Sequence, residues 1–204
     1  MAKPSGPNHK GKQTRPGRLR IVAGKWRSRL LPVADLPGLR PTSERTRETL
    51  FNWLAPTIEG SRCLDLFAGS GALGFEALSR GAAAVTFVEN SAPAVDNLRH
   101  AAAALPAADA TIVESDALRF LQRTRDDRYD LVFLDPPFSN KPPDDLCRLL
   151  AASNVLADDA RVYLERKRGQ PLTPLPAGWS IVREKSAGTV SYTLISAGTK
   201  EPRP

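Results

Sequence analysis

The chain has 204 residues, of which 41% are hydrophobic and 25% charged, and its formal net charge is +7. This length predicts one domain with a substantial buried core. No apolar run approaches the length of a membrane span and no signal peptide is recognisable, so we expect a cytoplasmic protein with no membrane partner. Cys63 and Cys147 fall on expected buried elements, and His9 and His100 lie far apart in the chain, which argues against a metal site, a disulfide and a Ser-His-Asp relay.

The basic residues are concentrated at the N-terminus. Nine of the 29 Lys and Arg residues lie in residues 1–29, which contain no Asp or Glu, whereas the remaining 20 accompany 22 acidic residues. Such segregation is typical of an electrostatic surface for nucleic acid. Residues 1–17 are rich in Pro, Gly and Lys and predict a disordered basic tail, whose alternative interpretation is a solubilising segment.

Residues 18–55 predict a basic hairpin followed by a helix. From Arg18 to Val33, basic residues alternate with apolar ones at period two, which favours a β-hairpin. Thr42 or Ser43 is then expected to cap a helix that continues to about Leu54. The basic side chains that we expect to contact RNA are Arg18, Arg20, Lys25, Arg27, Arg29, Arg40 and Arg45.

A glycine-rich turn follows the first apolar run of the central region. Residues 62–67 predict a buried strand, which leads into Gly69-Ser70-Gly71-Ala72-Leu73-Gly74 and a helix over 72–80. The G-x-G-x-x-G pattern between a strand and a helix is typical of nucleotide-binding sites. Glu89 ends the next expected strand, 84–89, and fits the acid that binds a ribose in a dinucleotide enzyme or in a methyltransferase.

Asp65 distinguishes these two classes of ligand. Its carboxylate precedes the glycine turn, where a dinucleotide would place its pyrophosphate, and two like charges about 4 Å apart repel by about 4 kcal/mol at an effective dielectric constant near 20. S-adenosylmethionine brings an ammonium and a sulfonium instead, so the same carboxylate attracts it. A helix-initiating Asp is the alternative for Asp65. Asp116, after the expected strand 110–114, is predicted equally well as a neighbour of the adenine or as a structural residue.

The tetrapeptide Asp135-Pro136-Pro137-Phe138 follows the apolar run 129–134 and predicts the site of the acceptor amine. Two prolines make a rigid loop at the carboxyl end of a buried strand, where open α/β sheets bind ligands. The Asp135 side chain and the Pro136 carbonyl can both accept hydrogen bonds from an NH₂ group, and Phe138 offers a face for a stacked base, worth about 1–3 kcal/mol. An ordinary Pro-rich turn is the alternative.

The remaining elements alternate along the chain. Helices are expected over 91–104, 116–124 and 143–152, and strands over 129–134 and 160–165. Such alternation predicts parallel βαβ units. Residues 179–185 and 189–197 are separated by too few residues for a parallel crossover, so they should pair antiparallel. The fold class is therefore α/β, with a mostly parallel sheet and an antiparallel last strand.

Together these motifs resemble the RsmD family, the bacterial 16S ribosomal RNA guanine-N2 methyltransferases. The N-terminal strings over 20–27, 38–42 and 47–54 carry the resemblance more specifically than the glycine turn, and the resemblance covers roughly residues 18–197. It implies a class I S-adenosylmethionine-dependent, Rossmann-like methyltransferase domain over residues 56–198. The basic tail (1–17) and the hairpin and helix (18–55) would precede this domain, and a disordered C-terminus (199–204) would follow it.

The resemblance also implies the reaction and its site. S-adenosyl-L-methionine would be the cofactor. The acceptor would be the N2 amine of a guanine in 16S rRNA or in the assembling small subunit. The protein would work as a monomer. The catalytic residues would be Asp135, Pro136 and Phe138; the cofactor would be bound by Asp65, Phe67, Gly69, Gly71, Glu89, Asn90, Asp116 and Ala117.

Three other functions remain open from the sequence. A DNA adenine or cytosine amino-methyltransferase shares the loop, but it ordinarily carries a sizeable target-recognition domain, and only about 60 residues lie outside 56–198 here. A glutamine methyltransferase of protein release factors uses Asn and Tyr where this chain has Asp135 and Phe138. A catalytically inactive RNA-binding fold would show a broken donor turn, and both loops are intact.

Overall fold

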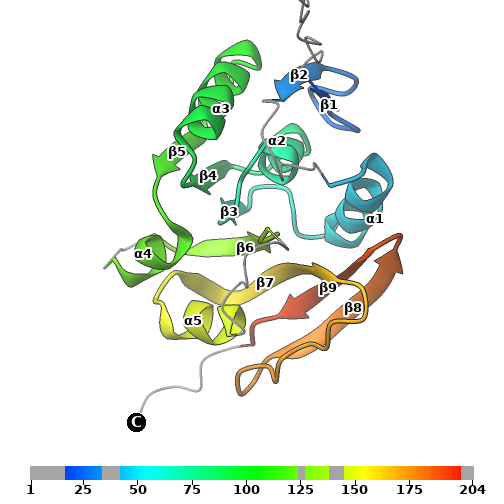
Figure 1. The fold of residues 1–204 in the computed structure, drawn as a ribbon, viewed down its shortest axis with the longest axis vertical. Helices are drawn as coiled ribbons and strands as arrows, with labels where there is room; N and C mark the ends of the chain where they lie inside the picture. Colours follow the sequence, from blue (N-terminus) through cyan, green and yellow to red (C-terminus); the bar gives the residue numbers. More distant parts are fainter. Residues whose placement is uncertain (1–16, 34–41, 124–126, 138–144, 199–204) are drawn as a thin grey trace, which may run out of the picture.

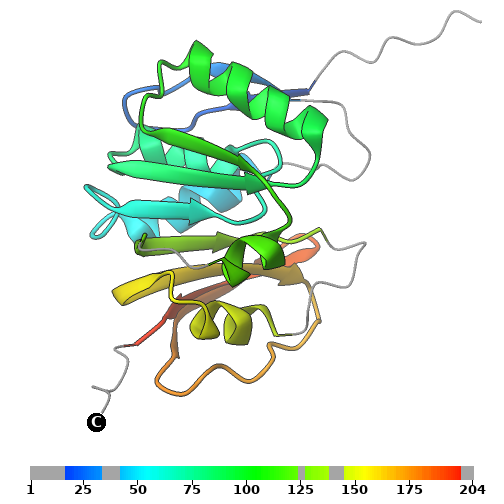
Figure 2. The same ribbon diagram turned by 90° about the vertical axis from the view of Figure 1, so that its left-hand side faces the viewer.

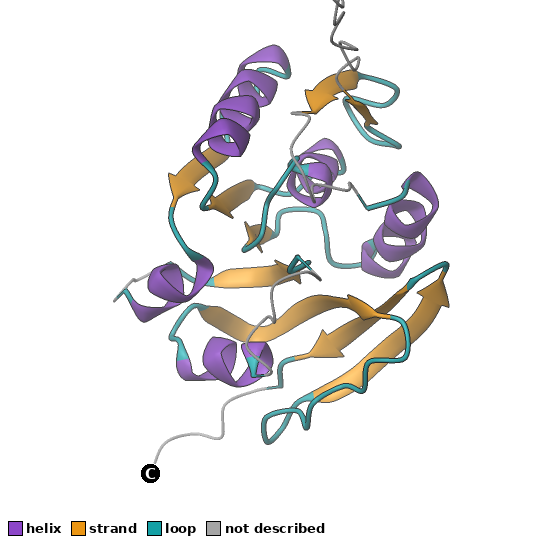
Figure 3. Ribbon diagram, in the orientation of Figure 1, coloured by secondary structure: helices purple, strands orange, loops and turns teal. Residues whose placement is uncertain are grey.

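The computed structural model describes residues 17–33, 42–123, 127–137 and 145–198. They form a seven-stranded sheet with helices on both faces and a separate two-stranded hairpin (Figures 1 and 3). The predicted disordered segments, 1–17 and 199–204, lie outside the described residues except for Gly17.

The sheet has the strand order β5-β4-β3-β6-β7-β9-β8. The first five of these strands run parallel, and β9 pairs antiparallel with both β7 and β8. In Figure 2 the strands β3, β6 and β7 follow one another down the molecule. This confirms the mostly parallel sheet with a reversed last strand. The strands are β3 (Arg62–Asp65), β4 (Ala84–Glu89), β5 (Ala110–Glu114), β6 (Tyr129–Leu134), β7 (Leu156–Lys167), β8 (Ser180–Ala187) and β9 (Val190–Ser196).

Two apolar clusters pack on opposite faces of the sheet. The first contains side chains from the hairpin and from α1, α2 and α3, and the second contains side chains from α4 and α5. The hairpin therefore shares a core with the central domain. The other elements are β1 (Gly17–Arg20), β2 (Leu30–Val33), α1 (Glu44–Leu54), α2 (Ala72–Ser79), α3 (Ala92–Ala104), α4 (Ala117–Gln122) and α5 (Leu146–Ala152).

Local sequence explains where several elements begin and end. Ser43 accepts a hydrogen bond from Thr46 N and caps α1, as expected of a Ser at this position. β3 ends at Asp65, two residues earlier than predicted, because the turn before the glycines begins there. α4 is shorter than the predicted 116–124, because Asp116 is its N-cap and Arg123 its C-cap. β7 is twice as long as the predicted 160–165. It extends to Lys167, where it pairs with β9, and it begins at Leu156, which pairs with Tyr129 of β6.

Candidate active site

Three acidic residues lie at the carboxyl ends of neighbouring parallel strands. Asp65 ends β3, Glu89 ends β4, and Asp135 follows β6. In the register of the sheet Asp65 pairs with Phe87 of β4 and Phe133 of β6, so Glu89 and Asp135 each lie two residues beyond the level of Asp65. The structure therefore brings the two sequence-predicted halves of the site to one edge of the sheet.

Asp65 is buried beneath the glycine turn. It is 1% exposed, and its Oδ2 accepts a hydrogen bond from Gly74 N at 3.1 Å, inside the first turn of α2. Burial raises the pKa of Asp65 from 3.8 to about 7; the bond from Gly74 opposes this, and the charges of Asp135 and Glu89 add to it. A buried carboxyl with raised pKa suits a site completed by a cation. Gly71, the N-cap of α2, has φ +77°, which a side chain would strain.

Glu89 is fixed by backbone N–H groups. Its Oε2 accepts from Gly69 N at 2.8 Å, and its Oε1 accepts from Asn90 N and Ser91 N at 2.9 Å each. Three of its roughly four lone-pair sites are thus occupied, and one remains for a ligand hydroxyl. The half-buried side chain is thus fixed at the end of β4, and its predicted role in binding a ribose stays a prediction.

The other predicted cofactor residues lie in the segments that follow β3, β4 and β5. Asp116 Oδ1 accepts from Leu118 N and Arg119 N, so its side chain caps α4, the structural alternative for this residue. Ala117 is buried in the first turn of the same helix. Phe67 is half-buried and packs against the second apolar cluster. Asn90 is exposed, directly after Glu89.

Asp135 is held by a hydroxyl from another part of the chain. Thr42 Oγ1 donates to Asp135 Oδ2 at 2.9 Å, across 93 residues of sequence. Burial raises the pKa of Asp135 to about 6, and the bond from Thr42 opposes this rise. Pro136 is buried, whereas Pro137 is exposed. Phe138 lies outside the described residues, so its predicted stacking role stays a prediction.

The structure adds Glu165 and Tyr163, which the sequence analysis missed. Glu165 lies on β7, is 4% exposed, and accepts a hydrogen bond from the Tyr163 hydroxyl at 2.7 Å. Burial raises the pKa of Glu165 to about 8, the charge of Asp135 raises it further, and the hydroxyls of Tyr163 and Thr42 oppose the rise. The signal in the sequence is a single acid at the end of the apolar run Val162-Tyr163-Leu164, next to the strand that bears Asp135.

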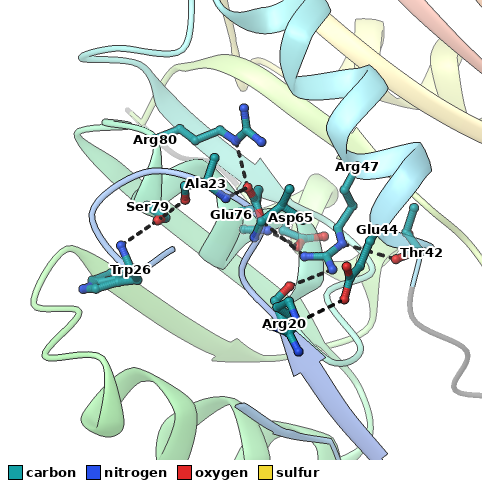
Figure 4. A network of polar contacts seen from close by, with 12 residues as sticks. Arg20, Ala23, Trp26, Thr42, Glu44, Arg47, Asp65, Glu76, Ser79 and Arg80 are labelled. Atoms are coloured by element: carbon teal, nitrogen blue, oxygen red, sulfur yellow. Dashed lines mark hydrogen bonds and ion pairs between the residues drawn. The ribbon is translucent and has the colours of Figure 1, made fainter. Parts of the chain in front are cut away.

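A second missed feature is a buried ion pair between Arg47 of α1 and Glu76 of α2, to which the hairpin loop is also hydrogen-bonded (Figure 4). Glu76 on α2 is fully buried and accepts four hydrogen bonds: from Val22 N at 2.8 Å, Ala23 N at 3.0 Å, Arg47 Nη1 at 3.2 Å and Arg80 Nε at 2.8 Å. Burial lowers the pKa of Arg47, and the charge of Glu76 opposes this. Two acceptor oxygens with four donors leave this carboxylate fully satisfied.

Arg47 and Ser79 make further hydrogen bonds between the hairpin and helices α1 and α2. Arg47 donates to the Arg20 carbonyl at 2.8 Å and to the Thr42 carbonyl at 3.3 Å, so it binds β1 and the segment that holds Asp135. Lys25 N donates to the Ser79 carbonyl at 2.7 Å. Gly24 has φ +83°, and a Cβ there would lie 1.8 Å from the same carbonyl oxygen, so the close approach of the hairpin loop to α2 requires glycine.

The structure describes six of the seven predicted RNA-contact residues, and all six are exposed. Arg20 forms a 3.7 Å ion pair with Glu44, and Lys25 lies 4.5 Å from the ring centre of Trp26. Arg29 donates to the Ala104 carbonyl at the end of α3. Arg40 lies outside the described residues. The others are Arg18 on β1, Arg27 in the hairpin loop and Arg45 on α1.

The described part of the chain has neither a candidate metal cluster nor a candidate membrane-spanning helix. Among the described residues, no three His, Cys, Asp or Glu side chains form a group able to hold a metal ion. No helix within the same ranges is both long enough and apolar enough to cross a membrane. Cys63 and Cys147 are both buried free thiols, and burial raises the pKa of each.

Comparison with known proteins identifies the family. Residues 19–196 match the family described as "Conserved hypothetical protein 95". The chain is 48% identical over 188 residues, 92% of each chain, to "Ribosomal RNA small subunit methyltransferase D" of Escherichia coli. It is 43% identical to the protein of the same name from Haemophilus influenzae, covering 95% of this chain and 98% of that one. The chain belongs to the RsmD family.

A solved structure agrees with this assignment. "Putative methyltransferase yhhF from Escherichia coli" superimposes with a TM-score of 0.82 at 44% identity, covering 90% of this chain and all of the other. The RsmD-family resemblance and the class I methyltransferase fold that it implied are therefore both confirmed.

Proposed function

We propose that this RsmD-family protein transfers a methyl group from S-adenosylmethionine to the N2 amine of a guanine in small-subunit ribosomal RNA. The observation that carries the proposal is the meeting of Asp65, Glu89 and Asp135 at one edge of the sheet. Family membership supports methyl transfer to ribosomal RNA. An exocyclic amine as the acceptor is inferred from the chemistry of the Asp135-Pro136-Pro137 loop, and guanine N2 is what the resemblance to the RsmD family implies.

The donor side of the site fits S-adenosylmethionine by the charges and hydrogen bonds of its residues. Asp65 offers a buried carboxyl for the donor's ammonium, and Glu89, held by three N–H groups, offers a lone pair for a ribose hydroxyl. Gly69 and Gly71 bring the backbone close to the ligand. When bound, the donor supplies an electrophilic methyl group on a sulfonium.

The acceptor side activates a weak nucleophile. The lone pair of guanine N2 is delocalised into the ring, so the amine must be drawn out of conjugation before it attacks. Asp135 is the carboxylate that accepts one amino hydrogen, and the Pro136 carbonyl accepts the other. Hydrogen bonds to an ionised group are about twice as strong as neutral ones. Thr42 fixes the Asp135 carboxylate, which aligns the amine, and such alignment supplies much of the rate of a group transfer.

The RNA side is the hairpin surface. Arg18, Lys25 and Arg27 are exposed on or beside β1 and the hairpin loop, and they extend the positive charge of the N-terminal segment. The hairpin is joined to α2, the helix that begins at the glycine turn. Phosphates bound along this surface would place the RNA at the same edge of the sheet, and the target base must leave its stack to reach Asp135.

The decisive experiment compares Asp135→Ala with Asp130→Ala. Asp130 is exposed on the same strand, with its carboxylate bonded to Arg62 N, and it serves as the matched control. Incorporation of tritiated methyl groups into undermethylated small-subunit RNA should fall at least a hundredfold in Asp135→Ala and stay near wild type in Asp130→Ala. Donor affinity measured by calorimetry should be retained in both.

Mass spectrometry of the digested RNA then identifies the product. N2-methylguanosine is expected from the wild-type reaction. Near wild-type turnover in Asp135→Ala, or methylation at another atom, would contradict the assignment of the acceptor loop.

A further inference from the structure

Four exposed basic side chains gather on the outer strands of the sheet, far from the hairpin. They lie at the end of β7 and on β8, and we call them the β8 patch: Lys167, Arg168, Arg183 and Lys185. Residues 161–198 contain six Lys and Arg but only two acids, Glu165 and Glu184. Glu165 is buried, and Glu184 accepts a hydrogen bond from Arg166 Nη2 at 2.6 Å. Among the residues that the structure describes, none of the four patch residues forms an ion pair with a carboxylate, so the patch keeps its positive charge.

A β-bulge turns two of these side chains toward the face of the sheet that carries α1. The register of β8 against β9 shifts by one residue between Ile181 and Arg183. After the shift, Arg183 lies opposite Leu194 and Lys185 opposite Tyr192, and both partners belong to the apolar cluster shared by α1, α2 and the hairpin. Directly opposite residues of paired strands point to the same face. Without the shift, the alternation of the strand would send both basic side chains to the other face, and bulges commonly re-aim side chains beside binding sites.

The β8 patch lies at the same edge of the sheet as the acids of the candidate site. Asp135 follows β6, and the parallel register of β6 with β7 puts Lys167 two residues beyond its level. The pairing of β7 with β9 ends at Lys167, so the turn between β8 and β9 also lies at this edge. Arg168 Nη1 donates to the Gly188 carbonyl of that turn at 3.3 Å. Figure 1 shows the hairpin and β8 at opposite ends of the molecule, with β3 and β6 between them, so the acids lie between two basic surfaces.

The reaction explains why two basic surfaces would be needed. The target base must leave its stack, so the RNA chain on both sides of the target nucleotide has to be held against the protein. Phosphate contacts supply such positioning without reading sequence. The hairpin, at one end of the molecule, is placed to hold one flank. We propose that the β8 patch binds the phosphates of the other flank, so that the RNA runs across Asp135 from the hairpin to the turn between β8 and β9. This inference rests on the proposed function, which takes small-subunit RNA as the substrate.

The test is the salt dependence of RNA affinity, measured with the full chain and undermethylated small-subunit RNA. Each lost phosphate contact should make the slope of log affinity against log salt concentration shallower by about 0.7. The double variant Arg183→Gln/Lys185→Gln should therefore lose about 1.4 from the slope, and at about 0.1 M salt its affinity should be about 25-fold lower than that of the wild type. Arg183→Lys/Lys185→Arg keeps both charges and should keep the wild-type slope.

Arg119→Gln/Arg148→Gln is the matched control. These exposed residues lie on α4 and α5, which pack on the opposite face of the sheet, so the same loss of charge should leave the slope unchanged. Retained affinity for S-adenosylmethionine in all the variants shows that they are folded. A slope in Arg183→Gln/Lys185→Gln equal to that of the control, or an equal loss of slope in both, would overturn the inference.

A second measurement needs no substitution in the patch. Partial acetylation of the wild-type protein, read by mass spectrometry, should be severalfold slower at Lys167 and Lys185 when RNA is bound, and slower also at Lys25 on the hairpin. Protection of Lys25 with unchanged reactivity at Lys167 and Lys185 would confine the RNA to the hairpin and refute the second surface. Protection at all three lysines, together with a product other than N2-methylguanosine, would refute the proposed acceptor and leave the β8 patch standing.

Discussion

Asp65→Asn separates the stability of the donor-free protein from its affinity for the donor. An asparagine keeps an oxygen that can accept the hydrogen bond from Gly74 N, and it removes the buried negative charge. We expect the variant to be more stable than the wild type without donor at alkaline pH. We also expect it to bind S-adenosylmethionine about ten- to a hundredfold more weakly, the equivalent of about 1.5–3 kcal/mol for a hydrogen bond to a charged group.

The magnitude and its pH dependence follow from the pKa of Asp65. The folded protein holds this pKa at about 7, above the usual 3.8, and the difference corresponds to about 4 kcal/mol as an upper limit. Between these two values the folded state keeps a proton that the unfolded state has lost, so wild-type stability falls as the pH rises through this range. Asparagine does not titrate. Its advantage should therefore be small near pH 4, grow towards pH 7 and then level off at about 2–4 kcal/mol.

Denaturant unfolding at pH 5, 6, 7 and 8 measures the difference in unfolding free energy between Asp65→Asn and the wild type, and thermal unfolding measures it as a difference in melting temperature. In a chain of this size, each kcal/mol corresponds to about 2–4 °C in melting temperature, so about 4–16 °C is expected at pH 8. Asp96→Asn, an exposed Asp on α3, is the matched control and should show no such growth with pH. An advantage of Asp65→Asn that did not increase between pH 5 and pH 7 would refute the reasoning. Unchanged donor affinity would refute the assigned contact with the ammonium.

Three further results are expected. Glu76→Ala should lower the free energy of unfolding, measured with denaturant, by about 3–5 kcal/mol, because it leaves the buried Arg47 charge unpaired. Glu48→Ala, at an exposed site on α1, is the control. A loss of stability in Glu76→Ala no larger than that in Glu48→Ala would contradict this prediction. If the protein contacts about six phosphates, a plot of log RNA affinity against log salt concentration should have a slope near −4, since each contact contributes about −0.7. Neutralising the five basic residues of the hairpin should flatten this slope more than deleting residues 1–17 does; these residues are Arg18, Arg20, Lys25, Arg27 and Arg29. An unchanged slope would place the RNA on another face. Phe138→Ala should weaken engagement of the target base by about 1–3 kcal/mol, seen as a raised Michaelis constant for RNA with unchanged donor affinity.

The sequence predicted the order and type of the described elements because their signals are local. Apolar periodicity gave β4, β5 and β6 with their observed bounds, and the short connection before Val190 predicted the antiparallel pair β8–β9. Boundaries were less accurate where pairing partners decide them. β7 continues to Lys167 because β9 is available to pair with it, and nothing within residues 160–167 reports that partner.

The contrast between local sequence signals and long-range contacts also explains which site residues were predicted. Asp65 lies four residues before the glycine turn that begins at Gly69, Glu89 ends an apolar run, and Asp135 ends another directly before two prolines, so the local pattern marks each as a ligand-binding position. Thr42 and Glu165 have no such pattern: Thr42 precedes a helix, and Glu165 lies within an ordinary strand. They become site residues only because 93 residues of chain bring Thr42 to Asp135 and the β6–β7 register brings Glu165 beside it. Contacts of this range depend on the whole topology.

The buried ion pair of Glu76 and Arg47 lies between the proposed RNA surface of the hairpin and the proposed donor site. Apolar side chains of similar volume could fill the same space and give equal or greater stability, since burying two charges is costly. They would, however, leave Val22 N and Ala23 N without acceptors beside α2. The carboxylate of Glu76 receives these two N–H groups and Arg47 together, while Asp65 receives the N–H of Gly74, two residues earlier on the same helix. Helix α2 is thus hydrogen-bonded to the hairpin loop through Glu76 and to Asp65 through Gly74, so the basic hairpin and the proposed donor site are both attached to one helix.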